Sequence, residues 1–169
     1  MLISGGHAIM LRVSAPKTMV DLVAQWCLER PGRTPSLEHH VTLIFIGRHL
    51  DSACHEAMDV AGESLYRALQ GFPMTLVGFG AWRRMGANNV LTEPVFPDPL
   101  VPLRSDMQSR LPFAKSEYGF KPHVTYAQAE SNFPYPMGGL VDSQYKVTGV
   151  VVKKGSGGKP GAESRVYAL

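Results

Sequence analysis

The sequence predicts an α+β fold: two pseudo-symmetric lobes with antiparallel-rich sheets around a central groove. Three observations support this prediction. Short apolar segments rich in β-branched residues alternate with segments whose apolar residues recur at helical spacing. The tripeptide His-Val-Thr occurs twice, at residues 40–42 and 123–125. Each copy opens the final strand of the same strand–helix–strand order, so the two halves share one organisation and the groove is expected to carry both copies.

The first half of the chain predicts a strand, a helix, a second strand and a longer helix. Residues 7–13 (HAIMLRV) have the length and the residue types of a strand. Residues 15–30 carry their apolar side chains on one helical face. Residues 39–46 (HHVTLIFI) read as the second strand, and Asp51 is expected to cap a helix that runs to about Leu69.

The second half repeats this order after an additional strand. Residues 72–82 are expected to form that strand and to pair with residues 88–95 across a glycine-containing turn. Asp98-Pro99 is expected to open a third helix. Three more strands are then predicted, at residues 121–127, 145–154 and 164–169. The chain of 169 residues is expected to form a single bilobal domain, residues 1–169.

Composition narrows the classes of function. The hydrophobic content of 44% argues against disorder, and the net charge of +3 is compatible with a phosphate-bearing ligand. The two cysteines, Cys27 and Cys54, lack the spacing of a zinc site or a disulfide framework, which favours a reduced, cytoplasmic setting. The sequence shows neither a signal peptide nor an apolar stretch of the ~20 residues that a membrane span needs. No membrane association and no obligate protein partner are therefore expected.

Strand periodicity predicts which side chains of the two motifs share a face, because side chains alternate along a strand. The predicted groove faces are formed by His40, Thr42 and Ile44 in the first strand and by His123, Thr125 and Ala127 in the second. The opposite, apolar face of the first strand is predicted to carry Val41, Leu43 and Phe45, and that of the second Val124 and Tyr126. His39 has the parity of the apolar face. We therefore expect His40 to be the catalytic residue of the pair and His39 to lie at the edge of the strand.

Two imidazoles and two hydroxyls suit the cleavage of a phosphodiester. One histidine can activate the attacking oxygen as a base while the other protonates the leaving oxygen as an acid. The hydroxyls of Thr42 and Thr125 can donate hydrogen bonds to the non-bridging phosphoryl oxygens. This chemistry requires neither a metal nor a cofactor. A metal site built from several histidines is the competing interpretation, but the sequence contains no HxH or HExxH pattern that supports it.

The motifs resemble the two-histidine (2H) phosphoesterase superfamily, which includes the RNA 2′,3′-cyclic phosphodiesterases, also called LigT-like 2′-5′ RNA ligases. The family pattern, H-x-[ST] followed by an apolar residue, matches residues 40–43 and 123–126. Flanking residues that also match are Phe45, Gly47, Phe120 and Pro122. The resemblance extends over roughly residues 7–152. Tyr126 stands where the family often has leucine, which leaves the catalytic pair intact but alters the surroundings of the pocket.

The resemblance implies a metal-independent phosphodiesterase that acts on a cyclic nucleotide or an RNA end. Substrates in this superfamily are 2′,3′-cyclic phosphates, 2′-5′ linkages and cyclic oligonucleotides. The compact chain resembles small phage enzymes that degrade the cyclic oligonucleotide signals of bacterial defence (anti-CBASS), and it resembles small RNA-end enzymes almost as closely. A non-catalytic RNA-binding module and a structural protein with coincidental motifs are the alternatives of other classes. The sequence leaves open which histidine is the acid, and whether water or a substrate 2′-OH attacks.

Four further residues are candidates for substrate binding. Lys121 has the parity of His123 and can attract phosphate. Trp82, Arg83 and Arg84 form a run that can stack on a base and bind phosphate, although such a pair of arginines can equally be a solvated turn. Lys153 and Lys154 end a predicted strand, where charges can simply protect the sheet edge.

Overall fold

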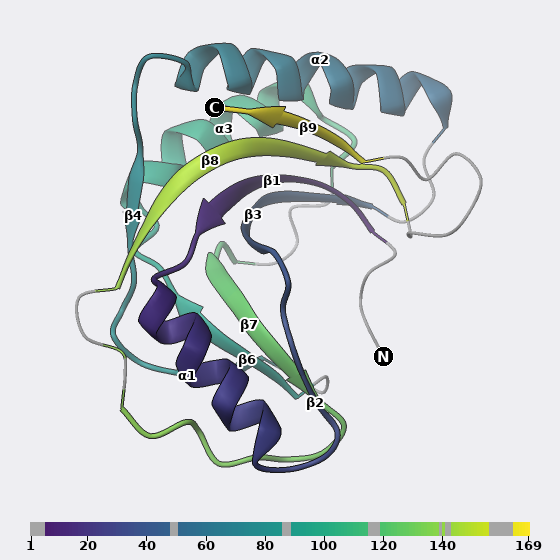
Figure 1. Cartoon of the computed structure of the whole chain (residues 1–169). Helices are drawn as coiled ribbons and strands as arrows, with labels where there is room; N and C mark the ends of the chain where they lie inside the picture. Colours follow the sequence, from purple (N-terminus) through teal and green to yellow (C-terminus); the bar gives the residue numbers. More distant parts are fainter. Residues whose placement is uncertain are drawn as a thin grey trace.

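The computed structural model of the chain describes residues 6–47, 51–85, 89–114, 119–138, 140, 143–155 and 164–169. Within these ranges nine strands form one curved antiparallel sheet in the order β4-β8-β1-β3-β7-β6-β5, with β2 paired to β7 and β9 paired to β8 (Figure 1). The strands are β1 (His7–Ser14), β2 (Arg33–Pro35), β3 (His39–Gly47), β4 (Thr75–Val77), β5 (Arg83–Met85), β6 (Val90–Pro94), β7 (His123–Ala129), β8 (Gln144–Lys153) and β9 (Arg165–Ala168). The helices are α1 (Lys17–Leu28), α2 (Ser52–Leu69) and α3 (Val101–Arg110), the last preceded by the 3₁₀ turn η2 (Asp98–Leu100).

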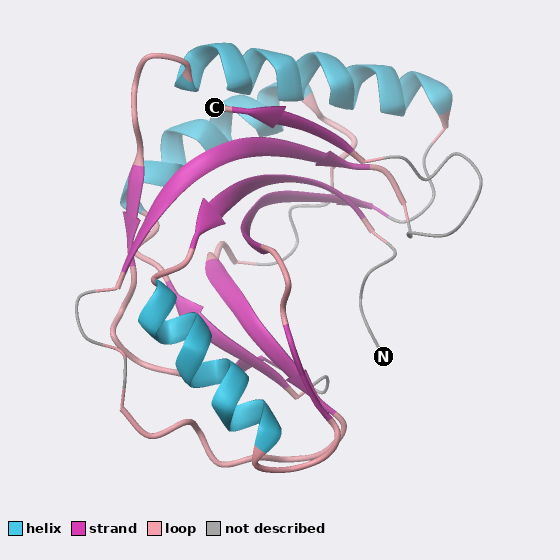
Figure 2. Cartoon of the chain, in the orientation of Figure 1, coloured by secondary structure: helices cyan, strands magenta, loops and turns pink. Residues whose placement is uncertain are grey.

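The helices cover two different parts of the sheet (Figure 2). Helix α2 packs on β8, and α3 packs on β3 and α2, whereas α1 packs on β7 and β2. Gly62 allows α2 to approach β8 closely, because a Cβ atom at this position would lie 2.2 Å from Cγ2 of Val152. As expected, Asp51 caps α2: its carboxylate accepts a hydrogen bond of 2.9 Å from the backbone N–H of Cys54. None of the helices formed by the described residues is long and apolar enough to cross a membrane.

The predicted internal repeat is present and its two halves interlock. The first half runs β1–α1–β3 and the second runs β6–α3–β7, and in each half the two strands are antiparallel neighbours. The helices, however, are exchanged between the halves. Helix α1, from the first half, packs on β7 of the second, and α3, from the second half, packs on β3 of the first. The halves therefore share one sheet and depend on each other for the burial of their strands.

The region between α2 and β6 differs from the prediction. Only residues 75–77 of the expected strand 72–82 are paired as a strand, and their partner is β8. Of the predicted pairing with residues 88–95, the described part of the chain keeps a single bridge, from Gly78 to Val95. The partner of β6 is instead β5, which includes the arginines that were expected in a turn. The strand β2 was not predicted, because its three residues, Arg33, Thr34 and Pro35, are too few and too polar to show strand periodicity.

Each motif strand contains a β-bulge at the same place, directly after its threonine. Between β1 and β3, Met10 pairs with Thr42 and Ile9 with Ile44, so Leu43 is the extra residue. Between β6 and β7, Thr92 pairs with Thr125 and Leu91 with Ala127, so Tyr126 is the extra residue. A bulge breaks the alternation of faces and increases the local twist. The prediction that Ile44 and Ala127 face the groove is therefore wrong; they are 1% and 0% exposed and belong to the core.

A carboxyl group is buried on the core side of β6, opposite Val124. Glu93 in β6 is 0% exposed and accepts three hydrogen bonds: from the backbone N–H of Gly80 at 2.8 Å, from the hydroxyl of Ser143 at 2.6 Å and from the hydroxyl of Tyr145 at 2.5 Å. Burial raises the pKa of Tyr145 far above its usual value, so the phenol keeps the proton that it donates. A buried polar group with all its partners is stable, whereas one that loses a partner is costly.

Gly78 makes room for this network and supplies a test of it. A Cβ atom at residue 78 would lie 2.3 Å from Oε1 of Glu93 and 2.4 Å from Oγ of Ser143. We expect Gly78→Ala to lower the free energy of unfolding by about 1–3 kcal/mol, the usual cost of overpacking. Urea denaturation measures the change, and Gly119→Ala is the matched control because a Cβ there meets nothing within 4 Å. Equal stability of the two variants would contradict the packing described for Glu93.

Candidate active site

The two His-Val-Thr motifs meet where β3 and β7 pair. Val41 is registered with Val124 in an antiparallel arrangement, and both valines are 0% exposed. The residues on either side of the two valines therefore point to the opposite face of the sheet. Extended by one residue in each direction, this antiparallel register places His40 across from Thr125 and Thr42 across from His123. The four side chains that the sequence singled out thus lie on one face, related by an approximate two-fold axis between the valines.

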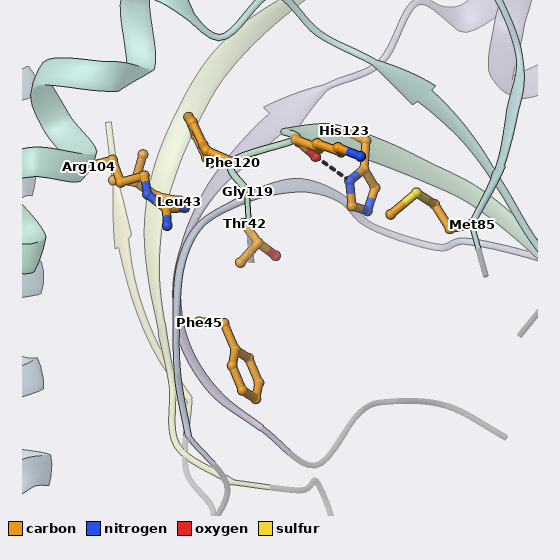
Figure 3. Close-up of a pocket in the computed structure, with 9 residues that line it drawn as sticks. Thr42, Leu43, Phe45, Met85, Arg104, Gly119, Phe120 and His123 are labelled. Atoms are coloured by element: carbon orange, nitrogen blue, oxygen red, sulfur yellow. Dashed lines mark hydrogen bonds between the residues drawn. The ribbon is translucent and has the colours of Figure 1, made fainter. Parts of the chain in front are cut away.

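The ring of His123 is held by a hydrogen bond to the backbone just before β7. Its Nδ1 lies 2.9 Å from the carbonyl oxygen of Lys121. Because a carbonyl oxygen only accepts, Nδ1 carries the hydrogen and donates it. In the neutral imidazole the lone pair therefore resides on Nε2. Figure 3 shows this ring beside Met85, with the hydroxyl of Thr42 nearby in the same pocket.

His40 is partly buried, and its environment disfavours the charged form. Burial is the main cause that lowers the pKa of His40. The positive charge of Lys153 lowers it further, as do His123 and His39 to a smaller extent. The negative charge of Glu38 has a smaller, opposing effect. Lys153 itself has a lowered pKa because of burial. The expectation that Lys153 only protects a sheet edge is therefore incomplete, since its ammonium group acts on His40. Near neutral pH, His40 is mainly an uncharged imidazole that can accept a proton.

His39 lies on the other face of β3 from His40, as the alternation of side chains predicted. Its ring centroid is 5.2 Å from that of Tyr126, a core residue that is 1% exposed. Burial lowers the pKa of His39, so this imidazole also avoids the charged form. His40, and not His39, therefore shares a face of the sheet with His123.

A cavity of about 410 Å³ adjoins Thr42 and His123 (Figure 3). Its lining residues are Thr42, Leu43, Phe45, Met85, Arg104, Gly119, Phe120, Lys121 and His123. Phe45 was predicted to lie on the core face, but the bulge at Leu43 turns it to the side of Thr42. Arg104 was not predicted to be near the site; its guanidinium lies 4.6 Å from the ring centroid of Phe120. Arg104 is one of several polar residues on the surface of α3, so no local sequence pattern indicates that it lies near the site.

The candidates for substrate binding fall into two groups. Lys121 is exposed and lines the cavity next to His123, as its parity suggested. Arg83 and Arg84 lie in β5 and line a second cavity, of about 420 Å³, that also reaches His123. Arg84 is partly engaged, because it donates a hydrogen bond of 3.1 Å to the carbonyl oxygen of Phe133.

Trp82 is not placed for the stacking role that the sequence suggested. Its side chain is only 7% exposed and packs edge-on against Tyr126, with ring centroids 5.2 Å apart. Both rings belong to the hydrophobic core beneath the motif strands. A base in the groove cannot reach this indole without unpacking the core, so Trp82 belongs to the core and not to the wall of the groove.

The histidines do not gather into a metal site in the described part of the chain. No group of three or more His, Cys, Asp or Glu residues is positioned there to hold an ion. His7 lies instead against α2, with its Nε2 2.8 Å from Nε2 of His55 and its Nδ1 donating to the carbonyl of Gly47 at 3.1 Å. This pair ties the end of β3 to the first turn of α2.

Solved structures match this chain over nearly its whole length, although no protein-family model and no curated protein matches its sequence. E. coli LigT complexed with 3′-AMP is 17% identical, with a TM-score of 0.56 over 97% of this chain and 95% of LigT. The protein TT0787 of Thermus thermophilus is 18% identical, with a TM-score of 0.61 over 96% and 94% of the two chains. The MHV ns2 PDE domain is 15% identical, with a TM-score of 0.56 over 85% and 97%. At these identities the likeness establishes a shared fold, and it confirms the 2H phosphoesterase-like fold that the two motifs predicted.

The effect of Lys153 on His40 can be measured directly. We expect Lys153→Gln to raise the pKa of His40, because the substitution removes a positive charge that opposes protonation. Titration of the His40 ring by NMR gives this pKa. Lys146→Gln, which removes an exposed lysine from the same strand, is the matched control and should leave it unchanged. An unchanged His40 pKa in the Lys153 variant would show that Lys153 does not reach the groove.

Proposed function

We propose that the chain is a phosphodiesterase that cleaves a nucleotide phosphodiester by acid–base catalysis with two histidines. The observation that carries the proposal is the pairing of Val41 with Val124, which puts both motifs on one face. Each histidine then lies across from the threonine of the other motif. In-line transfer at phosphorus requires a base and an acid on opposite sides of one phosphoryl group, and this arrangement supplies both.

The environment of His40 favours one division of roles. His40 acts as the base, because its lowered pKa keeps the imidazole ready to accept a proton. It removes the proton from the attacking oxygen, that oxygen bonds to phosphorus, and the bond from phosphorus to the leaving oxygen breaks. His123 acts as the acid: in its protonated form it delivers the proton on Nε2 to the leaving oxygen, while the hydrogen on Nδ1 stays bonded to the Lys121 carbonyl. The hydroxyls of Thr42 and Thr125 donate to the non-bridging oxygens, where charge develops.

The substrate class rests on the cations of the groove and on the fold. Lys121 and Arg104 line the cavity at His123, and Lys153 acts on His40. Structures with the same fold include a LigT complex with 3′-AMP and a PDE domain, which agrees with a nucleotide substrate. The substrate is accordingly a 2′,3′-cyclic phosphate, a 2′-5′ linkage or a cyclic oligonucleotide. Degradation of cyclic oligonucleotide immune signals, as by phage enzymes, is the narrower hypothesis. The alternative hypothesis is a non-catalytic RNA-binding module. Turnover that depends on the two histidines would exclude it.

Substitution of three histidines tests the proposal. We expect His40→Ala and His123→Ala each to lower kcat/KM by about 10²–10⁴-fold, the usual contribution of a proton-transfer group. The double variant should be far less than multiplicatively worse, since both groups serve one step. His39→Ala is the matched control, because it removes the adjacent imidazole from the opposite face. If folded His39→Ala were as inactive as folded His40→Ala, the assignment of the catalytic residue would be wrong.

Chelation is a separate test of the chemistry. We expect EDTA to leave kcat/KM unchanged, because the base, the acid and the hydrogen-bond donors are all supplied by the chain. The assay uses purified protein, one cyclic phosphodiester and a series of EDTA concentrations. Loss of turnover that one added metal restores would overturn the metal-independent mechanism and favour the histidine–metal alternative.

A further inference from the structure

The residue after Thr125 carries a polar group into the core. Tyr126 is the extra residue of the bulge in β7, and it is buried. The corresponding residue of the first motif is Leu43, which is also buried but has an apolar side chain. A bulge residue has no registered partner in the ladder, so the contacts of its own side chain help to set its orientation. At Tyr126 these contacts include hydrogen bonds, whereas at Leu43 they are apolar.

Two hydrogen bonds in series lead from Tyr126 to Glu93 and define the Tyr126–Tyr145–Glu93 network. The hydroxyl oxygens of the two tyrosines lie 2.5 Å apart, and that of Tyr145 lies 2.5 Å from Oε1 of Glu93. A phenol has a single hydrogen to donate. Because Tyr145 donates its hydrogen to Glu93, Tyr126 must be the donor to Tyr145. All three side chains are buried, so a group that loses its partner here is left unsatisfied.

The network joins parts of the sheet that are not neighbours. Tyr145 lies in β8, which is separated from β7 by β1 and β3. Glu93 lies in β6, and the register puts it opposite Val124, the residue before Thr125. Thr125 therefore lies between two residues that the network holds, Val124 through the partner strand and Tyr126 through its hydroxyl.

Tyr126 also contacts the strand of the first motif. Its ring centroid lies 5.2 Å from that of His39, the residue directly before His40. Among the described residues β3 and β7 share one registered pair. Contacts in the core beneath them therefore contribute to the angle at which the two strands meet, and Tyr126 supplies such a contact to both.

We propose that the Tyr126–Tyr145–Glu93 network positions Thr125, so that its hydroxyl meets a non-bridging oxygen of the bound phosphoryl group. The proposal rests on the phosphodiesterase function proposed above. Tyr126 and Tyr145 are positioning residues, because they touch neither the substrate nor the reacting atoms and act through the backbone of the bulge. Without the hydroxyl of Tyr126 the bulge loses the hydrogen bond that fixes its side chain, and Thr125 populates additional rotamers.

A double-mutant cycle tests this coupling. We expect Tyr126→Phe to lower kcat for 2′,3′-cyclic AMP about 10-fold at nearly constant KM, which is less than the loss of about 10²–10³-fold when such a donor is removed outright. In the Thr125→Ala background the same substitution should cause no further loss, because there is no hydroxyl left to position. Additive losses would show a general structural role and overturn the proposal.

Tyr66→Phe is the matched control. It also removes a tyrosine hydroxyl that takes part in a hydrogen bond, which it accepts from the side chain of Gln70 at 2.7 Å. This hydroxyl lies on α2, away from both motif strands. The control should leave kcat unchanged in the wild-type and in the Thr125→Ala background.

A measurement without substrate separates this proposal from the proposed function. Three-bond couplings measured by NMR report the χ1 rotamer of each threonine. We expect Tyr126→Phe to change the rotamer populations of Thr125 and to leave those of Thr42 as in the wild type, because Thr42 is followed by the apolar Leu43. An unchanged Thr125 in the folded variant would overturn the positioning proposal alone. Absence of turnover in the wild type, with Thr125 responding as expected, would overturn the proposed function and keep the coupling of Tyr126 to Thr125.

A second variant covers a failure to fold. If Tyr126→Phe does not fold, Tyr145→Phe removes the same hydrogen bond from its other side, and the same kinetic and NMR measurements apply. Failure of both variants to fold would assign the network to stability rather than to positioning, and would overturn the proposal.

Discussion

The structure depends on one junction, the pairing of Val41 with Val124. This is where the strands of the two repeats meet, and within the described residues it is the one registered pair between β3 and β7. Because both valines are fully buried, the core holds the junction from below, and the residues beside them must face the groove. The four groups proposed for catalysis therefore do not need a loop to position them. They lie on paired strands, which hold side chains in a narrow range of orientations.

The same sheet has two faces of opposite chemistry. On the groove side, cations such as Lys121, Arg104 and Lys153 surround the histidines. On the core side, the carboxyl group of Glu93 is enclosed by three hydrogen-bond donors from two separate segments, one at Gly80 and one at Ser143 and Tyr145. Glu93 lies in β6, which pairs with the motif strand β7, and the register puts Glu93 opposite Val124. The acidic group thus strengthens the junction from beneath and stays out of the groove, where it would repel a phosphate.

Alternation of side chains predicted the faces of the motif residues correctly over a short distance. His40 and Thr42 share a face, and His39 lies on the other, because the strand is regular up to the threonine. Beyond that point the bulge at Leu43 inverts the pattern, so Phe45 faces the groove and Ile44 the core. A bulge depends on the register with the partner strand, and a single strand's sequence does not record that register. Trp82 failed as a candidate for a related reason, since an indole looks the same in a sequence whether it lines a groove or fills a core.

The sequence by itself determined the elements and the motifs: the strand–helix–strand order in each half, the capped helix that begins after Asp51, and two histidine–threonine pairs with the correct parity. These follow from local periodicity and from residue types, which act over a few positions. Only the tertiary structure decided that α1 and α3 exchange halves, that both bulges follow the threonines, and that Phe45, Arg104 and Lys153 surround the site. The reason is physical. These features arise from the pairing and packing of segments distant in the chain, and the free energy of such contacts depends on partners that no local stretch of sequence contains.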